Sequence, residues 1–261
     1  MRILRKLAAR QYVRYKVEKF DYLYHCALRQ GIILFSMPKC AGSTLKRIVQ
    51  LLEVGGDSSR LPANVHDKQA SPLCGFLEAP GPVSRYFVGD DFFRFFFVRN
   101  PYTRILSCYL DKFENDATGR FARKLGFRPG DAISFKAFLE KLQDDRLLHL
   151  NPHWAPQFYL ASPDRIEYHF IGKFENLQSD IRAVLQQIDP EGIHRELLNV
   201  SERPHQTGAA SRIADYYGAE EARLVREIYR EDFSSFSYSD ALEDALNGGA
   251  DGPAAQRMHH P

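Results

Sequence analysis

The sequence predicts an α/β fold with a mostly parallel central sheet and helices on both faces. Three observations carry this prediction. Residues 32–35 and 94–99 are short runs rich in apolar residues that do not alternate with polar ones, as in strands covered on both faces. Each run is followed by a turn and by apolar residues at helical spacing. A third such run, 166–172, precedes another helical pattern, so strands and helices alternate along the chain.

Composition narrows the class of protein. The chain has 261 residues, of which 44% are hydrophobic and 26% charged, enough for one sizeable core. A net charge of +2 argues against nucleic acid as a general partner. The sequence shows neither an apolar run of about 18 residues nor the apolar core of a secretory signal. The four cysteines of the chain are Cys26, Cys40, Cys74 and Cys108. Because they lack C-x-x-C spacing, they indicate neither a zinc site nor a disulfide framework, and they favour a reducing compartment.

Residues 1–30 are expected to form a basic amphipathic helix. Up to residue 21 the segment carries seven Lys or Arg residues against Glu18 and Asp21. A helix of this kind can lie on an anionic membrane, so one interpretation is peripheral contact through residues 1–29. The alternative is a helix packed on the domain with solvated charges, which the irregular apolar stripe favours.

The stretch from Ile32 to Ile48 reads as a strand, a tight turn and a helix. The first N–H groups of such a helix lack internal partners, and the helix dipole adds positive potential, so the turn can bind a phosphate-like anion. Lys39 adds a full charge to the turn. The kinase-type loop does not fit, because Lys39 precedes Gly42 by three residues and Met37 occupies the position of the first Gly. The alternative is an ordinary strand-turn-helix with an exposed Lys.

The second strand leads to a similar arrangement. Pro101 suits the first turn of a helix, and Arg99 stands at the carboxyl end of the strand. Ser107 follows eight residues later, about two helical turns along. Ligands gather at the carboxyl ends of strands in α/β sheets, where Lys39 is also expected.

The rest of the chain is expected to consist of long loops and further helices. Residues 57–92 form a long loop, and acceptor specificity is expected there and in 111–165. Helices are expected over 135–142 with Ser134 as N-cap, over 177–188 with Asn176 as N-cap, and over 219–230. The main domain then covers 31–239, and the Gly- and Ala-rich segment 240–261 is expected to be a disordered tail.

Two of these stretches together resemble the sulfotransferase family. Residues 38–44 resemble its 5′-phosphosulfate loop, and residues 99–109 resemble its 3′-phosphate motif, R-x-P-x-x-R-x-x-S-x-Y. The resemblance covers roughly 31–238 and implies a P-loop-like, three-layer fold. Further stretches are similar to the Golgi carbohydrate branch, which includes chondroitin 4-O-sulfotransferase and the enzyme that makes the HNK-1 epitope: 61–66, 153–157, 168–175 and 228–238.

The sequence also departs from the Golgi branch. The Golgi enzymes carry an N-terminal membrane anchor, and this sequence shows none. Where they have paired cysteines after the His-Trp stretch, residues 160–164 read Leu-Ala-Ser-Pro-Asp. Both departures fit a bacterial relative in the cytoplasm, peripheral to the inner face of the membrane if residues 1–29 bind there. The vertebrate acceptor is therefore not carried over.

The resemblance implies the sulfuryl donor PAPS (3′-phosphoadenosine 5′-phosphosulfate) and no metal. Lys39 would stabilise charge on the departing phosphate, and Ser43 and Thr44 would help to bind the 5′-phosphate. Arg99 offers a planar fork for the 3′-phosphate, and Ser107 offers a second donor. Arg203 or Arg212 would close over the nucleotide. The donor-binding residues so implied are Pro38, Lys39, Cys40, Ala41, Gly42, Ser43, Thr44, Arg99, Ser107 and Arg212.

The acceptor hydroxyl needs a base, and His66 is the first candidate. It lies in the loop after the phosphate-binding helix, where related enzymes place a catalytic His, and an ordinary His titrates near neutrality. His153 is the second candidate. Three alternatives stay open: Arg104 binds the nucleotide or is structural, Cys40 is activated or only fills the turn, and Trp154 stacks on a sugar or belongs to the core.

These observations predict a PAPS-dependent O-sulfotransferase acting on a carbohydrate or glycolipid, with His66 and Lys39 as catalytic residues. One alternative is a protein that binds PAPS or its product PAP without catalysis. Another is an ATP-dependent phosphoryl-transfer enzyme, which the position of Lys39 before Gly42 argues against.

Overall fold

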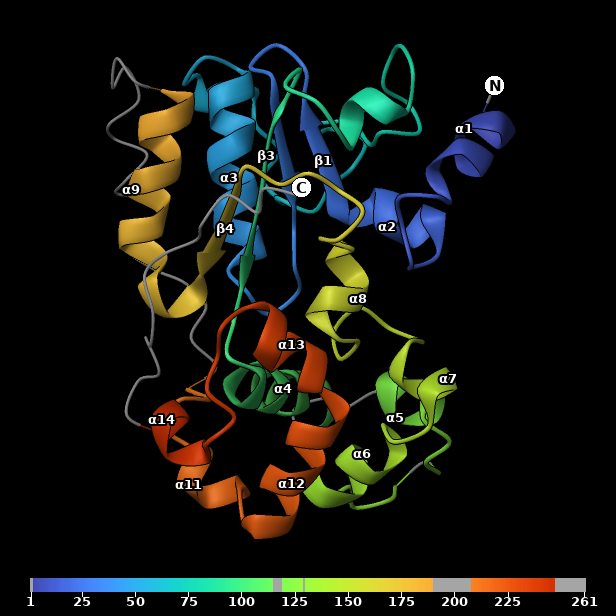
Figure 1. Cartoon of the computed structure of the whole chain (residues 1–261), viewed down its shortest axis with the longest axis vertical. Coiled ribbons are helices and arrows are strands. Elements are labelled where there is room, and N and C mark those ends of the chain that lie inside the picture. Colours follow the sequence, from blue (N-terminus) through green and yellow to red (C-terminus); the bar gives the residue numbers. More distant parts are fainter. Residues whose placement is uncertain (1, 115–118, 129, 190–207, 247–261) are drawn as a thin grey trace. The chain divides into compact units, whose positions relative to one another are not determined.

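The computed structural model describes residues 2–114, 119–128, 130–189 and 208–246 (Figure 1). The chain divides into two compact units. Unit 1 contains the described parts of 1–98 and 159–204, and unit 2 contains those of 99–158 and 205–252. The domain expected over 31–239 therefore includes parts of both units.

Unit 1 is built on a four-stranded sheet in the order β1-β2-β3-β4. β1 runs antiparallel to β2, whereas β2 with β3 and β3 with β4 are parallel. In the register Phe35 pairs with Phe96, and Phe96 pairs with Ile171 on its other side. The predicted mixed α/β fold with a mostly parallel sheet is thus confirmed. The strands are β1 (Tyr24–Ala27), β2 (Ile32–Phe35), β3 (Phe93–Val98) and β4 (Phe170–Lys173).

The continuous apolar runs are explained by burial. All four residues of β2 are at most 1% exposed, and Phe95 to Val98 of β3 are at most 2% exposed. Helices flank the sheet as predicted: α3 packs on β1 and β2, and α9 packs on β4 (Figure 1). The helical segments of unit 1 outside the N-terminal region are α3 (Gly42–Glu53), η1 (Ser58–Arg60), η2 (Ser84–Tyr86), η4 (Phe174–Asn176) and α9 (Leu177–Ile188).

The N-terminal segment differs from the single helix expected over 1–30. It forms α1 (Arg2–Ala9) and α2 (Val17–Leu23), and the chain then enters β1. Tertiary contacts explain the difference. Tyr24 packs in a ring cluster with Phe20 and Phe87, and β1 pairs with β2 along its whole length. Strand pairing therefore overrides the helical spacing of the apolar residues.

The long loop after α3 returns to the edge of the sheet at Cys74. Its N–H and C=O groups exchange hydrogen bonds with those of Cys26 in β1, at 2.8 and 3.2 Å. A buried carboxylate fixes the next turn, since Asp21 accepts a hydrogen bond from the N–H of Leu77 at 2.9 Å. The segment between α3 and Cys74, which carries His66, is thus anchored at both ends.

The described part of unit 2 is helical. Its interior contains the fully buried rings of Tyr102, Phe138 and Trp154. Residues 242–246 form a helix, so the expectation of a disordered tail from residue 240 is wrong over these residues, and 247–261 lie outside the described residues. One of the sequence boundaries between the units, after Phe158, falls within α8. The helices are α4 (Pro101–Tyr109), η3 (Leu110–Glu114), α5 (Arg120–Lys124), α6 (Phe135–Lys141), α7 (Asp145–Leu148), α8 (Gln157–Ala161), α11 (Ile213–Tyr216), α12 (Ala219–Ile228), α13 (Arg230–Ser235) and α14 (Leu242–Leu246).

None of the described helices is both long enough and apolar enough to span a bilayer.

Candidate functional site

The loop between β2 and α3 has a strained backbone. Lys39 and Ala41 have φ angles of 70° and 57°, in the left-handed region that costs a residue with a Cβ roughly 1–2 kcal/mol. Gly42 has no room for a side chain, because a Cβ there would lie 2.5 Å from Ser36 Oγ. Strain of this kind persists where the surroundings enforce it and is common at ligand sites. The loop therefore combines two residues in a strained conformation with a glycine that lies close to the residue after β2.

The first turn of α3 is suited to an anion. The residue before the helix is Ala41, which supplies no capping hydrogen bond from its side chain. The N–H groups of the first turn and the positive end of the helix dipole are therefore available to an anionic ligand. Ser43 is exposed and Thr44 half-exposed, so their hydroxyls can serve as further donors. Cys40 is buried and its thiol contacts the Pro38 carbonyl at 3.6 Å, which favours the filler interpretation.

The structure brings His66 onto this turn. Its Nε2 atom lies 3.0 Å from Ser43 Oγ, although the two residues are 23 positions apart. The backbone N–H of His66 donates to Asn64 Oδ1 at 2.9 Å, which fixes the local loop conformation. The candidate base and the candidate phosphate loop thus meet within unit 1.

Two further residues of α3 hold the loop that carries His66. Arg47 Nη2 donates to the carbonyls of Pro62 at 2.9 Å and Ala63 at 3.3 Å. The side-chain amide of Gln50, which is fully buried, lies 3.4 Å from the carbonyl of Val65 and 3.2 Å from Ser71 Oγ. The sequence-based reasoning missed both residues. The polar face of α3 is the sequence feature that could have identified them, because positions 43, 47 and 50 lie on one side of the helix.

A buried lysine shapes the electrostatics around His66. Lys46 is 3% exposed, and burial lowers the pKa of its ammonium group to about 8. It forms no hydrogen bond with the described residues. The pKa of His66 is lowered by partial desolvation and then by the charge of Lys46. Burial, with Lys46 and Lys68, holds the pKa of neighbouring His25 well below its ordinary value. His66 is therefore favoured in its neutral form, which can accept a proton.

In unit 2, Arg99 follows the last residue of β3 and is fixed by a buried polar chain. Gln157 makes two hydrogen bonds of 2.9 Å with the backbone N–H and C=O of Arg99. Asp232 in turn accepts from the N–H of Gln157 at 2.8 Å, and burial raises the pKa of this carboxyl. The side chain of Arg99 donates through Nε to Thr103 Oγ1 at 3.0 Å. Gln157 and Asp232 were not predicted as site residues, although Gln157 ends the His-Trp stretch of the resemblance.

The other residues of the 3′-phosphate motif lie on α4. Asn100 caps the helix by accepting from the N–H of Tyr102 at 3.0 Å, and Pro101 occupies its first position. Ser107 is 1% exposed in the second turn. Arg104 is equally buried and donates to the carbonyls of Ala155 at 3.0 Å and Pro152 at 3.1 Å. These bonds favour the structural interpretation of Arg104.

The remaining candidates of unit 2 have protein partners. Arg212 forms a two-bond pair with Glu114, at 3.0 and 3.2 Å, and Arg203 lies outside the described residues. Half-buried His153 contacts Asn151 Oδ1 through Nδ1 at 2.8 Å. Trp154 is fully buried and donates through Nε1 to the carbonyl of Leu147 at 2.8 Å, so it is a core residue.

The predicted residues thus form two groups, one within each unit. Unit 1 contains the loop and the candidate base. Unit 2 contains Arg99, Ser107, Arg212 and His153.

Comparison with known proteins gives one family. The model of the family described as "Sulfotransferase family" matches residues 24–239. Mouse carbohydrate sulfotransferase 14 is 28% identical over 193 residues, covering 63% of this chain and 50% of the relative. The zebrafish (Danio rerio) protein of that name is 32% identical over 168 residues, covering 58% and 44%. Mouse carbohydrate sulfotransferase 11 is 26% identical over 230 residues, covering 80% and 64%. The chain spans about half the length of the first curated relatives it matches, and no solved structure matches it.

Proposed function

Because the chain belongs to the sulfotransferase family, we propose that it transfers a sulfuryl group from PAPS to a hydroxyl of a carbohydrate or glycolipid. The observation that carries the proposal is the 3.0 Å contact between His66 and Ser43. A side chain able to take a proton is thereby attached to the first turn of a helix whose N-terminus suits a phosphate. The names of the carbohydrate sulfotransferase relatives support the choice of acceptor.

The donor side of the reaction rests on the two groups of residues. PAPS supplies an activated sulfuryl group on its 5′-phosphate. We assign the 5′-phosphate to the loop of Pro38, Cys40, Ala41 and Gly42 with the hydroxyls of Ser43 and Thr44. Lys39 stabilises the negative charge that grows on the departing phosphate oxygen.

The 3′-phosphate is assigned to Arg99 and Ser107. The guanidinium fork of Arg99 suits a phosphate, and Gln157 fixes the backbone from which it extends. Arg212 is assigned to the nucleotide as well. Its side chain donates to the carboxylate of Glu114 and to the hydroxyl of Tyr216, and a phosphate can replace the carboxylate as an anionic acceptor.

The acceptor side rests on His66. Its Nε2 atom removes the proton as the acceptor oxygen attacks sulfur. The bond between sulfur and the bridging oxygen breaks in the same in-line step, and its electron pair stays on the phosphate next to Lys39. The lowered pKa of His66 favours the neutral ring, which can accept the proton.

We also place the protein in the cytoplasm, with its N-terminal segment on the inner face of the membrane. Four free thiols support this location, since cytoplasmic thiols are kept reduced.

The experiment is a transfer assay with radiolabelled PAPS and a panel of glycans and glycolipids, together with calorimetric titration of PAP. Labelled acceptor and tight PAP binding are the expected results. PAP binding without turnover on any acceptor would favour the non-catalytic alternative. Displacement of PAP by equimolar ATP would favour phosphoryl transfer, and absence of both transfer and PAP binding would overturn the proposal.

A further inference from the structure

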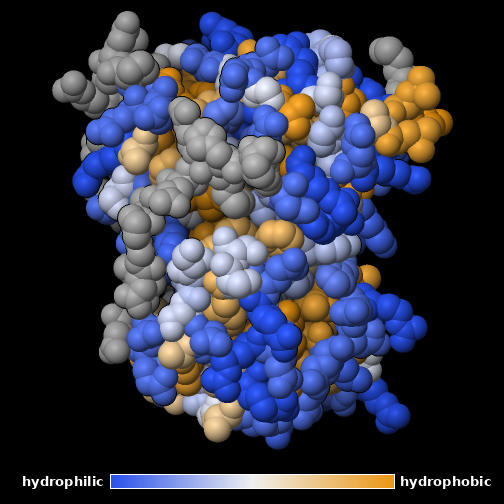
Figure 2. Space-filling model, viewed as in Figure 1, coloured by the Kyte–Doolittle hydropathy of each residue, from blue (hydrophilic) through white to orange (hydrophobic). Residues whose placement is uncertain are grey.

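The first helix has its apolar side turned to solvent. With about 100° between successive residues, Ile3, Leu4 and Leu7 lie on one side of α1. They are 74%, 71% and 52% exposed and make up half of the large exposed apolar side chains in the described chain. Figure 2 shows hydrophobic surface at the place of the helix labelled α1 in Figure 1. A helix that stabilises a fold by packing buries this side instead.

The opposite side of α1 is fixed to unit 1 by polar bonds. Arg5 donates to the carbonyl of Phe76 through Nε at 3.2 Å and to that of Gly81 through Nη1 at 2.6 Å. Ala9 is fully buried, and Lys6 pairs with Glu18 at 2.6 Å. The orientation of the helix is therefore built in. The apolar side is presented outward because Arg5 and Ala9 occupy the inward side.

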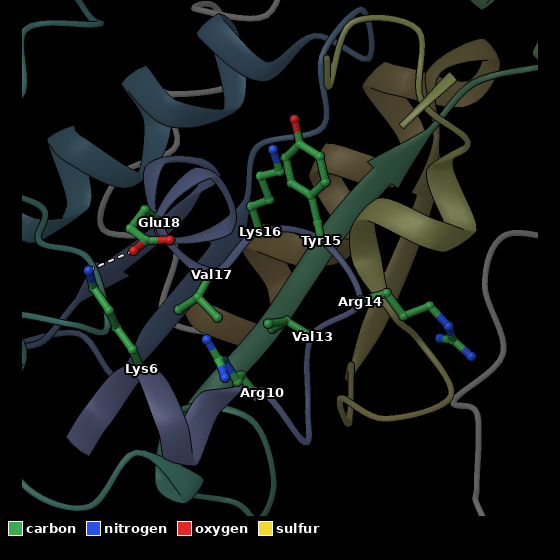
Figure 3. Close-up of a pocket in the computed structure, with 8 residues that line it drawn as sticks. All are labelled: Lys6, Arg10, Val13, Arg14, Tyr15, Lys16, Val17 and Glu18. Atoms are coloured by element: carbon green, nitrogen blue, oxygen red, sulfur yellow. Dashed lines mark ion pairs between the residues drawn. The ribbon is translucent and has the colours of Figure 1, made fainter. Parts of the chain in front are cut away.

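A strongly basic hollow adjoins this helix. A cavity of about 330 Å³ is lined by Lys6, Arg10, Val13, Arg14, Tyr15, Lys16, Val17 and Glu18 (Figure 3). Its lining carries four cationic side chains and one carboxylate; Lys6 pairs with that carboxylate, and Arg14 pairs with Asp164 beside the cavity. Arg10 and Lys16 are exposed and form no ion pair with any residue that the structure describes. The surface next to the apolar side thus has an excess of positive charge.

We propose that α1 docks the protein on an anionic lipid bilayer, with Ile3, Leu4 and Leu7 at the level of the upper acyl chains and Arg10 and Lys16 facing lipid phosphates. Apolar insertion and attraction to anionic headgroups are two signals that reinforce each other. A neutral bilayer lacks the negative charge that would attract Arg10 and Lys16, and a soluble anion lacks the apolar phase that would bury the apolar side of α1. The proposal rests on the membrane placement proposed above and assigns its residues and lipid class, and its test does not depend on sulfuryl transfer.

The test uses the full chain and vesicle flotation without PAPS. Vesicles of phosphatidylcholine alone are compared with vesicles containing about 30 mol% phosphatidylglycerol, at low salt and at roughly 0.5 M NaCl. We expect binding to the anionic vesicles, weakened at least about tenfold by high salt or by the neutral lipid.

Two variants separate the signals. Combined Ile3→Ser, Leu4→Ser and Leu7→Ser should lower vesicle affinity at least about tenfold, and Arg10→Gln with Lys16→Gln should remove most of the salt dependence. The matched control is Tyr22→Ser with Leu28→Ser, which removes exposed apolar side chains of α2 and its neighbourhood and should leave binding unchanged. The variant with Arg10→Gln and Lys16→Gln keeps the apolar residues of α1, so it tests the proposal even if the triple serine variant misfolds.

Three results would overturn the proposal. Equal binding of the wild-type chain to neutral and anionic vesicles would remove the role of charge. Unchanged binding of the folded serine variant would remove the role of α1. A wild-type dimer by light scattering that becomes a monomer in the serine variant would show that a second copy covers this face.

Discussion

The Nε2 atom of His66 lies 3.0 Å from the Oγ atom of Ser43. The contact joins the proposed base to the proposed donor loop within a single unit. In the proposed reaction the Ser43 hydroxyl donates to the 5′-phosphate, and Nε2 of His66 is then released to the acceptor. Binding of the donor thus prepares the base.

The first prediction concerns the base. His66→Ala should lower kcat by a factor of about 10² to 10⁴, the usual effect of general base catalysis, and leave PAP affinity within about twofold. His149→Ala is the control, since this half-buried ring lies in unit 2 and its Nδ1 atom contacts the Asp145 carbonyl at 2.9 Å. Steady-state kinetics and PAP titration check both. A large loss of kcat in His153→Ala, with His66→Ala fully active, would reverse the assignment.

The second prediction concerns the acid limb of the pH–rate profile. The positive charge of Lys46 disfavours the imidazolium form of His66 and so helps to lower its pKa. Lys46→Met should raise that pKa, and the acid limb of kcat/KM should move to higher pH. Arg29→Met removes an exposed cation elsewhere in unit 1 and should leave the profile in place. An unmoved limb in Lys46→Met contradicts the electrostatic role.

The third prediction concerns stability. Burial lowers the pKa of Lys46 from 10.5 to about 8, so the unfolded chain binds more protons than the folded chain between these values. The free energy of unfolding contributed by this group therefore rises with pH from about 8 to 10.5. Lys46→Met should raise the melting temperature at pH 7 by a few degrees, roughly 2–4 °C, and flatten the pH dependence. Differential scanning calorimetry from pH 7 to 10.5 measures the melting temperature of both chains. A wild-type melting temperature that does not change over this pH range would show that the ammonium group of Lys46 is not desolvated.

The fourth prediction concerns the loop that carries His66. Arg47→Ala removes two hydrogen bonds to the loop backbone and should lower kcat/KM by roughly tenfold, with PAP affinity retained. Hydrogen exchange over residues 62–71 should increase in the same variant. Arg47→Lys keeps one donor and should recover part of the activity. Faster hydrogen exchange without any change in kcat/KM would show that the two hydrogen bonds from Arg47 are only structural.

The fifth prediction concerns recognition of the 3′-phosphate. Gln157→Leu removes both hydrogen bonds to the backbone of Arg99. The preference for PAP over AMP should then fall at least about tenfold, whereas AMP affinity should change little. Exposed Gln143→Leu is the matched control. If Gln157→Leu weakens PAP and AMP equally, the buried chain does not act through the 3′-phosphate.

Local patterns predicted much of unit 1. β2 and the helix over 177–188 have the expected bounds, because continuous burial and amphipathic spacing are local properties. β1 was missed, since only pairing with β2 makes a strand of a segment with helical spacing. Asn176 makes no capping bond, because a 3₁₀ turn precedes the helix there.

The sequence predicted the kind of site, an anion-binding loop with a histidine base, but not how its residues are arranged in space. Residues 38–44 could be read as an anion loop, since a strand end and a helix start define it. The place of His66 could not, because it depends on hydrogen bonds from Arg47 and Gln50 to distant backbone atoms. The division of the predicted residues between two units is likewise a property of the tertiary structure.

The hydrogen bonds that Arg47 and Gln50 of α3 donate to the loop carrying His66 are accepted mainly by backbone carbonyls, those of Pro62, Ala63 and Val65. Every amino acid offers such a carbonyl, so the anchoring does not depend on which side chains the loop carries. Mutational drift can therefore change the side chains of this loop while the imidazole of His66 stays in place. If acceptor specificity lies in residues 57–92, as the sequence predicts, randomising positions 63 and 65 with α3 unchanged should change the acceptor and retain the proposed transfer.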